Sequence, residues 1–385
     1  MKKIFKYILG ALLTILMLIS GCSNSKVIYS DEYVSGQDQQ YWYYASPMPE
    51  CPMIDTKDGY YFINHKFIYY RDKSTEETIP VCNKPECLHN DESCNAFLGK
   101  GIVRILAYYS NKIYYIVEDT ISGSMCDILY EFTPDGKHKQ LHVFPELVDY
   151  TAFHRGFLYY NTTDNGTISG KEEDTQTTVH FYRIPIRNLD SKPELLYEYK
   201  GIYADLCKLL CYGNNIYFVQ FAYVDPSMKQ FYTQMNKYNI LDGTMNAILE
   251  GCYAQYTIFN DKLAFTDGEG TYLCDLDGQD VQKVWDKWGI LSPSSKYLLS
   301  DTACNFTVMD GTLPRTIGAI DTEGHIIGSI ELNKFIVNPV GVTNDEYLVA
   351  NFDNETQLMT IYQIPVDKIA DNTGQPEVFF EYTGQ

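Results

Sequence analysis

The chain repeats one pattern along most of its length: short runs of β-branched and aromatic residues separated by turn residues. The clearest copy covers residues 112–144, where three such runs are followed or separated by short turns, one of them Pro134-Asp135-Gly136. Runs of this composition between turn residues predict antiparallel strands. A unit that recurs every few tens of residues is typical of solenoids, propellers and other repeat arrays.

The repeated units can be aligned on their second run, which gives seven copies with spacings of 34 to 58 residues. These spacings bracket the length of a four-stranded propeller blade. The aligned positions are Tyr61, Tyr115, Tyr160, Phe218, Phe265, Leu299 and Val349. We therefore predict an all-β fold over residues 51–385, a β-propeller of seven four-stranded blades. Six and eight blades are the alternatives, because the first unit is the shortest and its first strand, near residues 53–55, is weak.

Three polar insertions interrupt the units, at residues 164–177, 223–229 and 301–314. Each falls between a predicted second strand and a predicted third strand, so all three should leave the disc at one rim. Loops carry function more often than strands do, and we expect this rim to bind a ligand. The 34 Tyr residues fit many short, half-exposed strands, because Tyr tolerates one wet edge. An aromatic surface that binds carbohydrate is the alternative interpretation.

The first 22 residues have the features of a bacterial export signal. Lys2, Lys3 and Lys6 precede an apolar run at residues 8–19, which is shorter than the roughly 20 residues that cross a bilayer. Ser20-Gly21-Cys22 then resembles the lipobox of bacterial lipoproteins, which implies cleavage before Cys22 and lipidation of its thiol. Several acyl chains give a stable anchor that one chain cannot.

This N-terminal pattern predicts a signal peptide at 1–21 and a tether at 22–50 that begins with the lipidated Cys22. The folded part should then lie on the extracytoplasmic face of the cell membrane. An ordinary secretory signal with an incidental Cys is the alternative. Removal of the three leader lysines would change the formal charge from −20 to −23. A chain so acidic repels nucleic acid and favours cationic partners, and we expect a monomer.

Four potential metal ligands lie within thirteen positions: Cys82, Cys87, His89 and Cys94. Three thiols and one imidazole suit a structural Zn²⁺ ion, although the spacing matches none of the common zinc fingers. A disulfide knot is the alternative, since disulfides form outside the cytoplasm, with Cys51 as the natural partner of the odd thiol. Free buried thiols are a third interpretation. In each case we expect a structural staple.

The region 58–96 resembles a family of uncharacterised bacterial surface lipoproteins whose extracellular part is assigned to propellers like those of the low-density-lipoprotein receptor. The resemblance is carried by Asp58-Gly59-Tyr60-Tyr61-Phe62, Phe67-Ile68-Tyr69-Tyr70, Cys82-x-Lys84-Pro85-x-Cys87-x-His89 and Cys94-Asn95-Ala96. It implies a surface lipoprotein with a propeller domain, and it implies no activity and no catalytic residues.

Motifs that name a reaction are absent from the sequence: it has no Gly-x-Ser-x-Gly elbow, no His-Glu-x-x-His and no phosphate loop. The prediction is therefore a lipid-anchored binding module for a protein, peptide or glycan, with no catalytic residue assigned. One alternative is a propeller-type lyase or glycosidase with acids at the channel mouth. Another is a scaffold for assembly of the cell envelope.

Overall fold

The computed structural model is an all-β protein built from antiparallel sheets, which confirms the all-β part of the prediction. It describes residues 53–383 apart from gaps at 65, 122, 134–135, 166–175, 226, 253–254, 305–312, 333–337, 344, 354–355 and 357. The predicted signal peptide, Cys22, the tether and Cys51 lie outside the described residues. Within the described part, no helix is long and apolar enough to cross a membrane.

Five sheets have four strands each, and in every one the strands follow one another in chain order. The first holds β1 (Met53–Asp55), β2 (Gly59–Asn64), β3 (Phe67–Asp72) and β4 (Thr78–Pro80). The second holds β5 (Ile102–Tyr109), β6 (Lys112–Ile121), β7 (Ser124–Phe132) and β8 (His138–Val143).

The other three four-stranded sheets come from the second half of the chain. One holds β16 (Tyr256–Phe259), β17 (Lys262–Thr266), β18 (Thr271–Cys274) and β19 (Gln282–Trp285). The next holds β20 (Ile290–Pro293), β21 (Leu298–Asp301), β22 (Arg315–Ile320) and β23 (Ile326–Leu332). The last holds β24 (Asn338–Thr343), β25 (Glu346–Asp353), β26 (Leu358–Pro365) and β27 (Glu377–Thr383).

The sixth sheet has seven strands because one long strand serves two groups of neighbours. Its members are β9 (Val148–His154), β10 (Phe157–Asn165), β11 (Gln176–Pro185), β12 (Glu194–Tyr212), β13 (Asn215–Tyr223), β14 (Phe231–Asn239) and β15 (Met245–Glu250). The first part of β12 pairs with β11 and the second part with β13. The register shifts twice along the second pairing, and Tyr203 and Lys208 have positive φ, so the strand bends between its two roles.

The sequence predicts two separate strands where β12 is continuous, and the structure corrects this. Residues 200–202 remain paired with β11, and Ile202 also pairs with β13, so the strand continues through this point. A short helix, α3 (Val366–Ala370), follows β26, and its Val366, Ile369 and Ala370 are buried. Two 3₁₀ turns, η2 (Ile186–Asn188) and η3 (Thr302–Cys304), complete the described elements.

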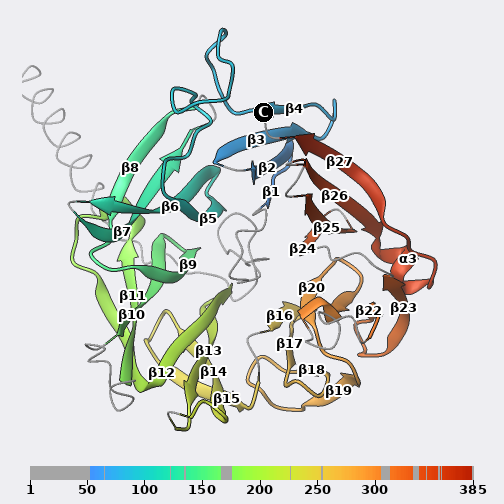
Figure 1. The fold of residues 1–385 in the computed structure, drawn as a ribbon. Helices are drawn as coiled ribbons and strands as arrows, with labels where there is room; N and C mark the ends of the chain where they lie inside the picture. Colours follow the sequence, from blue (N-terminus) through green and yellow to red (C-terminus); the bar gives the residue numbers. More distant parts are fainter. Residues whose placement is uncertain are drawn as a thin grey trace, which may run out of the picture.

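The sheets are arranged around a common centre, as Figure 1 shows, with the first strand of each nearest the centre. Neighbouring inner strands contact one another, among them β5 with β9, β9 with β12, and β16 with β20. The first and last sheets, blue and red in Figure 1, lie side by side. Their contact includes Phe62 against Phe380, whose ring centroids are 5.1 Å apart, and Arg71 over Phe379.

Seven apolar clusters fill the spaces between facing layers of strands. One cluster joins the first and second sheets, and another joins the last sheet to the first through Phe62, Tyr69, Ile361 and Phe380. A further cluster lies between the two halves of the seven-stranded sheet. Burial of apolar surface stabilises a protein by roughly 25 cal/mol per Å². A small sheet is only marginally stable alone, so packing between the sheets provides most of the stability of the fold.

All seven aligned positions fall in the second strand of a four-strand unit, as predicted: β2, β6, β10, β13, β17, β21 and β25. The expectation of half-exposed tyrosines is wrong for five of them, because Tyr115, Tyr159, Tyr217, Tyr256 and Tyr347 are fully buried. Several buried hydroxyls reach a polar partner, which offsets the cost of removing them from water. Tyr217 donates to the Leu276 carbonyl at 3.2 Å, and Tyr115 pairs with His138 Nδ1 at 2.7 Å.

The tight turns between third and fourth strands also make contacts between sheets. Gly278 has φ +76°, and a Cβ built on it would lie 2.3 Å from the Ile248 carbonyl oxygen of β15. Glycine is required there for two reasons: the left-handed backbone and the close approach of the neighbouring strand. Gly324 has the same place in the next sheet, where an added Cβ would lie 2.9 Å from Val284 of β19.

The three polar insertions occupy the predicted place between a second and a third strand: β10 to β11, β13 to β14, and β21 to β22. In an antiparallel sheet the end of the second strand, the start of the third, the end of the fourth and the start of the first share one end. We call this the loop end of the sheets. The three insertions therefore leave at the loop end, as predicted.

Candidate functional site

A group of charged side chains lies at the loop end of the inner strands. It consists of Arg104, Glu118, Asp127, Asp149 and Asp205, and we call it the acidic cluster. Arg104 stands near the start of β5, Asp149 near the start of β9, and Asp205 where β12 begins to pair with β13. Glu118 and Asp127 come from β6 and β7 of the second sheet. Four acids thus share one cation within the cluster.

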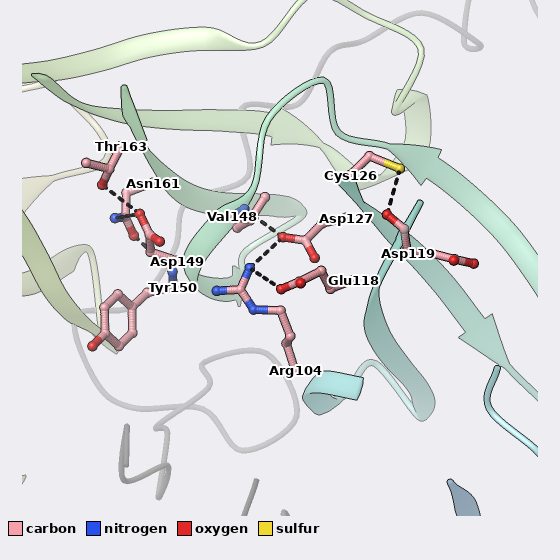
Figure 2. Close-up of polar contacts among 10 residues, drawn as sticks. All are labelled: Arg104, Glu118, Asp119, Cys126, Asp127, Val148, Asp149, Tyr150, Asn161 and Thr163. Carbon is pink, nitrogen blue, oxygen red and sulfur yellow. Dashed lines mark hydrogen bonds and ion pairs between the residues drawn. The ribbon is translucent and has the colours of Figure 1, made fainter. Parts of the chain in front are cut away.

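Asp127 links two neighbouring sheets. Its Oδ2 accepts hydrogen bonds from Arg104 Nη1 at 2.9 Å and from the Val148 backbone N–H at 2.7 Å, as Figure 2 shows. Arg104 Nη1 also lies 3.8 Å from Glu118 Oε2. The Asp127 side chain is fully buried, and burial raises the pKa of this carboxyl although Arg104 and the Val148 N–H favour its charged form. Asp127 Oδ1 has no hydrogen-bond partner among the described residues.

Asp149 and Asp205 form the second part of the cluster. Asp149 Oδ2 accepts from Thr163 Oγ1 at 2.7 Å and from Asn161 Nδ2 at 3.3 Å (Figure 2). Burial raises the pKa of Asp149. Burial and the nearby negative charge of Asp149 raise the pKa of Asp205 to about 7. A carboxyl with such a pKa can hold or release a proton near neutral pH, which general acid–base chemistry requires.

A partly buried lysine, Lys208, stands three residues further along β12. Lys208 Nζ donates to the Tyr256 carbonyl oxygen at 2.6 Å and lies 5.2 Å from the centre of the Tyr256 ring. Burial lowers the pKa of Lys208 to about 8. The inner part of β12 therefore carries two groups, Asp205 and Lys208, whose pKa values are displaced toward neutrality.

A shallow hollow of about 460 Å³ lies at the loop end between β14–β15 and β17. Its lining is Phe231, Tyr232, Thr233, Glu250, Gly251 and Asp267. Phe231 and Tyr232 are 44% and 37% exposed. Two carboxylates and two aromatic rings thus face one solvent-open space, whose size is in the range of small-ligand sites.

The aromatic surface continues from the hollow onto the neighbouring strand. Phe221 contacts Phe231 with ring centroids 5.4 Å apart, and Tyr223 contacts Phe221 at 5.0 Å and Tyr203 at 6.1 Å. The insertion after β13 adds Val224 and Met228, both more than half exposed. Exposed apolar groups gathered in this way are typical of an interaction site.

The predicted group of three cysteines and one histidine is brought together between the first and second sheets. The ligand atoms of Cys82, Cys87, His89 and Cys94 all lie within 4.8 Å of one another. His89 Nδ1 is 3.3 Å from Cys94 Sγ, and the Ala96 N–H points at the same sulfur at 3.3 Å. Burial acts to raise the pKa of the Cys82 thiol, but N–H groups of Lys84 and Asn95 outweigh it and lower the pKa.

The sequence predicts the cysteine group because its members are close together in the chain. It does not predict the acidic cluster, whose members come from β5, β6, β7, β9 and β12 and become neighbours only when the sheets pack. Nor does it predict the hollow, although its place beside the insertion at 223–229 agrees with the expected binding rim. The polar Asp149 at the start of an apolar strand is the one signal in the sequence that could have pointed to the cluster.

No protein-family model matches the chain, and no curated protein matches it. Among solved structures, the acylaminoacyl peptidase of Pyrococcus horikoshii is similar over 81% of this chain and 51% of its own, with 10% identity and a TM-score of 0.49. This chain therefore spans about half the length of the peptidase.

Two further solved structures are similar. AztD of Citrobacter koseri matches over 83% of this chain and 79% of its own, with 13% identity and a TM-score of 0.39. The AfRom2 CNH domain matches over 79% and 90%, with 8% identity and a TM-score of 0.44. Similarities this distant say nothing about the activity of this chain.

The raised pKa of Asp205 gives a test of the acidic cluster. An Asp in an unfolded chain has a pKa of about 4, so between about pH 4 and pH 7 the folded chain holds more protons than the unfolded chain. The free energy of unfolding should therefore fall as the pH rises through this window. Asp205→Asn cannot ionise, and it should raise the melting temperature relative to the wild type at pH 8 but leave it nearly unchanged at pH 4.

Thermal unfolding of both proteins at the two pH values measures this difference. Asp286→Asn is the matched control, because the Asp286 side chain is 95% exposed and its removal should have a small effect at both pH values. An equal change in melting temperature on Asp205→Asn at pH 4 and pH 8 would show that the folded structure does not destabilise the ionised form of Asp205.

Proposed function

We propose that this protein is a lipid-anchored, extracytoplasmic β-propeller of seven blades that binds a ligand at the loop end of its sheets. Seven blades are supported by the seven apolar clusters and by the double role of β12, which makes one seven-stranded sheet equivalent to two units. Closure of the ring is supported by the contacts of Phe62 and Arg71 in the first sheet with Phe380 and Phe379 in the last.

The observation that carries the binding role is the hollow lined by Phe231, Tyr232, Glu250 and Asp267. A glycan is the ligand class that fits it best, because sugar C–H faces pack against aromatic rings and sugar hydroxyls donate to carboxylates. A peptide with a basic side chain would use the same carboxylates, and the net charge of −20 would favour its approach.

Membrane anchoring rests on the sequence around Cys22, which ends an apolar run after three lysines. Attachment there would hold the propeller outside the cell, where a surface glycan or peptide is within reach. The chain would act as a monomer, because a single propeller contains the whole loop end that is proposed to bind the ligand.

A second candidate function is hydrolysis or elimination on a polysaccharide. The observation that favours it is the pair Asp149 and Asp205, two carboxyls on neighbouring inner strands with raised pKa values. Asp205, with a pKa of about 7, would be the acid or base. Polysaccharide turnover that is abolished by Asp205→Asn would show that the protein is an enzyme rather than a binding module.

Replacement of the lipidated residue tests the anchor. Cys22→Ser removes the thiol that would carry the diacylglycerol, so the chain should move from the membrane fraction to the soluble or secreted fraction of its host. Immunoblotting of fractionated cells measures this. Cys126→Ser is the control, because this thiol is buried in the second sheet and cannot be acylated from the membrane. Retention of Cys22→Ser in the membrane would contradict the proposal.

Replacement of the two exposed rings tests the binding site. Phe231→Ala combined with Tyr232→Ala should weaken binding of the best ligand from an oligosaccharide and peptide panel by about tenfold or more, since buried aromatic contacts dominate recognition. Isothermal titration with the purified protein measures the change.

Val378→Ala is the matched control for the ring variants. Val378 is an apolar side chain of β27 that is 54% exposed and lies outside the hollow, and its replacement should leave binding unchanged. Equal affinity of the ring variant and the wild type would remove the hollow as the ligand site.

A further inference from the structure

We propose that Cys82, Cys87, His89 and Cys94 bind one structural zinc ion that clasps the first and second sheets together. The four residues belong to the connection between β4 and β5. This site is separate from the hollow and from the acidic cluster, and it does not depend on the proposed ligand.

The four ligand atoms are already close to the geometry of a zinc site. All of them lie within 4.8 Å of one another, and His89 Nδ1 is 3.3 Å from Cys94 Sγ. Zinc–sulfur bonds of about 2.3 Å at a tetrahedral centre place two sulfurs about 3.8 Å apart. A small contraction of the group is therefore enough to form all four bonds.

The donor set selects the ion. Three thiolates and one imidazole are soft or borderline ligands, which prefer zinc to calcium or magnesium. Four protein ligands leave no open position, which is typical of structural rather than catalytic zinc. A disulfide would pair only two of the three thiols and leave the third beside His89. The three thiols of the group are free in the structure.

Short turns with backbone hydrogen bonds position the ligand residues in the connection. The Cys87 N–H donates to the Lys84 carbonyl at 3.2 Å, and the Cys94 N–H donates to the Asp91 carbonyl at 3.1 Å. His89 has φ +57°, a left-handed conformation that an L-residue seldom adopts without a compensating interaction. Coordination of its ring would provide one. The Ala96 N–H directed at Cys94 Sγ would stabilise the negative charge of a bound thiolate.

The residues after the last ligand connect the site to both sheets. On the first sheet, the Ile68 N–H donates to the Ala96 carbonyl at 2.9 Å, and the Leu98 N–H donates to the Lys66 carbonyl at 2.8 Å. On the second sheet, His138 Nε2 lies 2.5 Å from the Asn95 carbonyl oxygen.

Cys94, Ala96 and Leu98 are themselves buried in the apolar cluster that joins the two sheets. An ion bound beside them would hold this segment in place, so its loss should loosen the interface between the first two sheets.

The test is a metal and thiol count on the full-length protein, purified without added metal or chelator. Elemental analysis should find about one zinc per chain. Reaction of the native protein with a thiol reagent should leave the three cluster thiols unmodified until zinc is removed by a chelator, and zinc release should accompany their modification. Replacement by Co²⁺ should give the visible absorption of a tetrahedral thiolate complex.

Two variants separate the site from general effects on folding. Cys87→Ser removes one ligand that is only partly buried and should abolish stoichiometric zinc, whereas Cys126→Ser, a thiol of the second sheet outside the group, should keep it. If Cys87→Ser does not fold, the absorption spectrum of the Co²⁺-substituted wild type decides whether the group binds a metal ion. Two outcomes would overturn the proposal: zinc-free protein with two cluster thiols lost to a disulfide, and zinc-free protein with all three thiols reactive.

Discussion

The packing of apolar side chains between facing sheets is the interaction on which the rest of the structure depends. An isolated four-stranded sheet of this chain has two apolar faces and cannot cover either of them. Each of the seven apolar clusters takes side chains from two neighbouring units, so every unit is stabilised only when both neighbours are present. The cluster of Phe62, Tyr69, Ile361 and Phe380 is the one in which the two ends of the folded chain meet.

Polar contacts reinforce these interfaces at a few positions. Arg315 of β22 forms a paired contact with Asp301 of β21, and Tyr347 of the last sheet donates to the same carboxylate. All three side chains are buried, and loss of one partner from such a group typically costs about 3–5 kcal/mol. Asp127 has a similar role between the second and third units through the Val148 N–H. These contacts fix the orientation of sheets that apolar packing alone would hold loosely.

Much of the fold could be predicted from the sequence, because strand patterns and tight turns are local. The second strands were located through residues such as Tyr115 and Phe218. The continuous strand β12 was missed, because the chain bends at Tyr203 and Lys208 without leaving the sheet, where the sequence predicts a break between two strands. The burial of Tyr159 and Tyr217 was missed because sequence does not show which face of a strand meets the next sheet.

The sites also differ in how far apart their residues lie in the chain. The cysteine group was predicted because its four ligands lie within thirteen positions of the chain. Asp149 and Asp205 are 56 positions apart, and the pKa shift of Asp205 arises only when β9 and β12 pack side by side. The hollow needs β14, β15 and β17 to come together. Neither the acidic cluster nor the hollow therefore has a local pattern in the sequence.

A double-mutant cycle between Phe62 and Phe380 tests most directly whether the sheets form one closed ring. Phe62→Leu and Phe380→Leu are made singly and together, and the free energy of unfolding is measured by denaturant titration. Their rings are 5.1 Å apart across the junction of the first and last sheets, so a coupling energy of about 0.5–1.5 kcal/mol is expected. The pair Phe62 and Phe153, which lie in different clusters, should show none. Additive effects of Phe62→Leu and Phe380→Leu would mean that the first and last sheets do not touch, and the ring would be open.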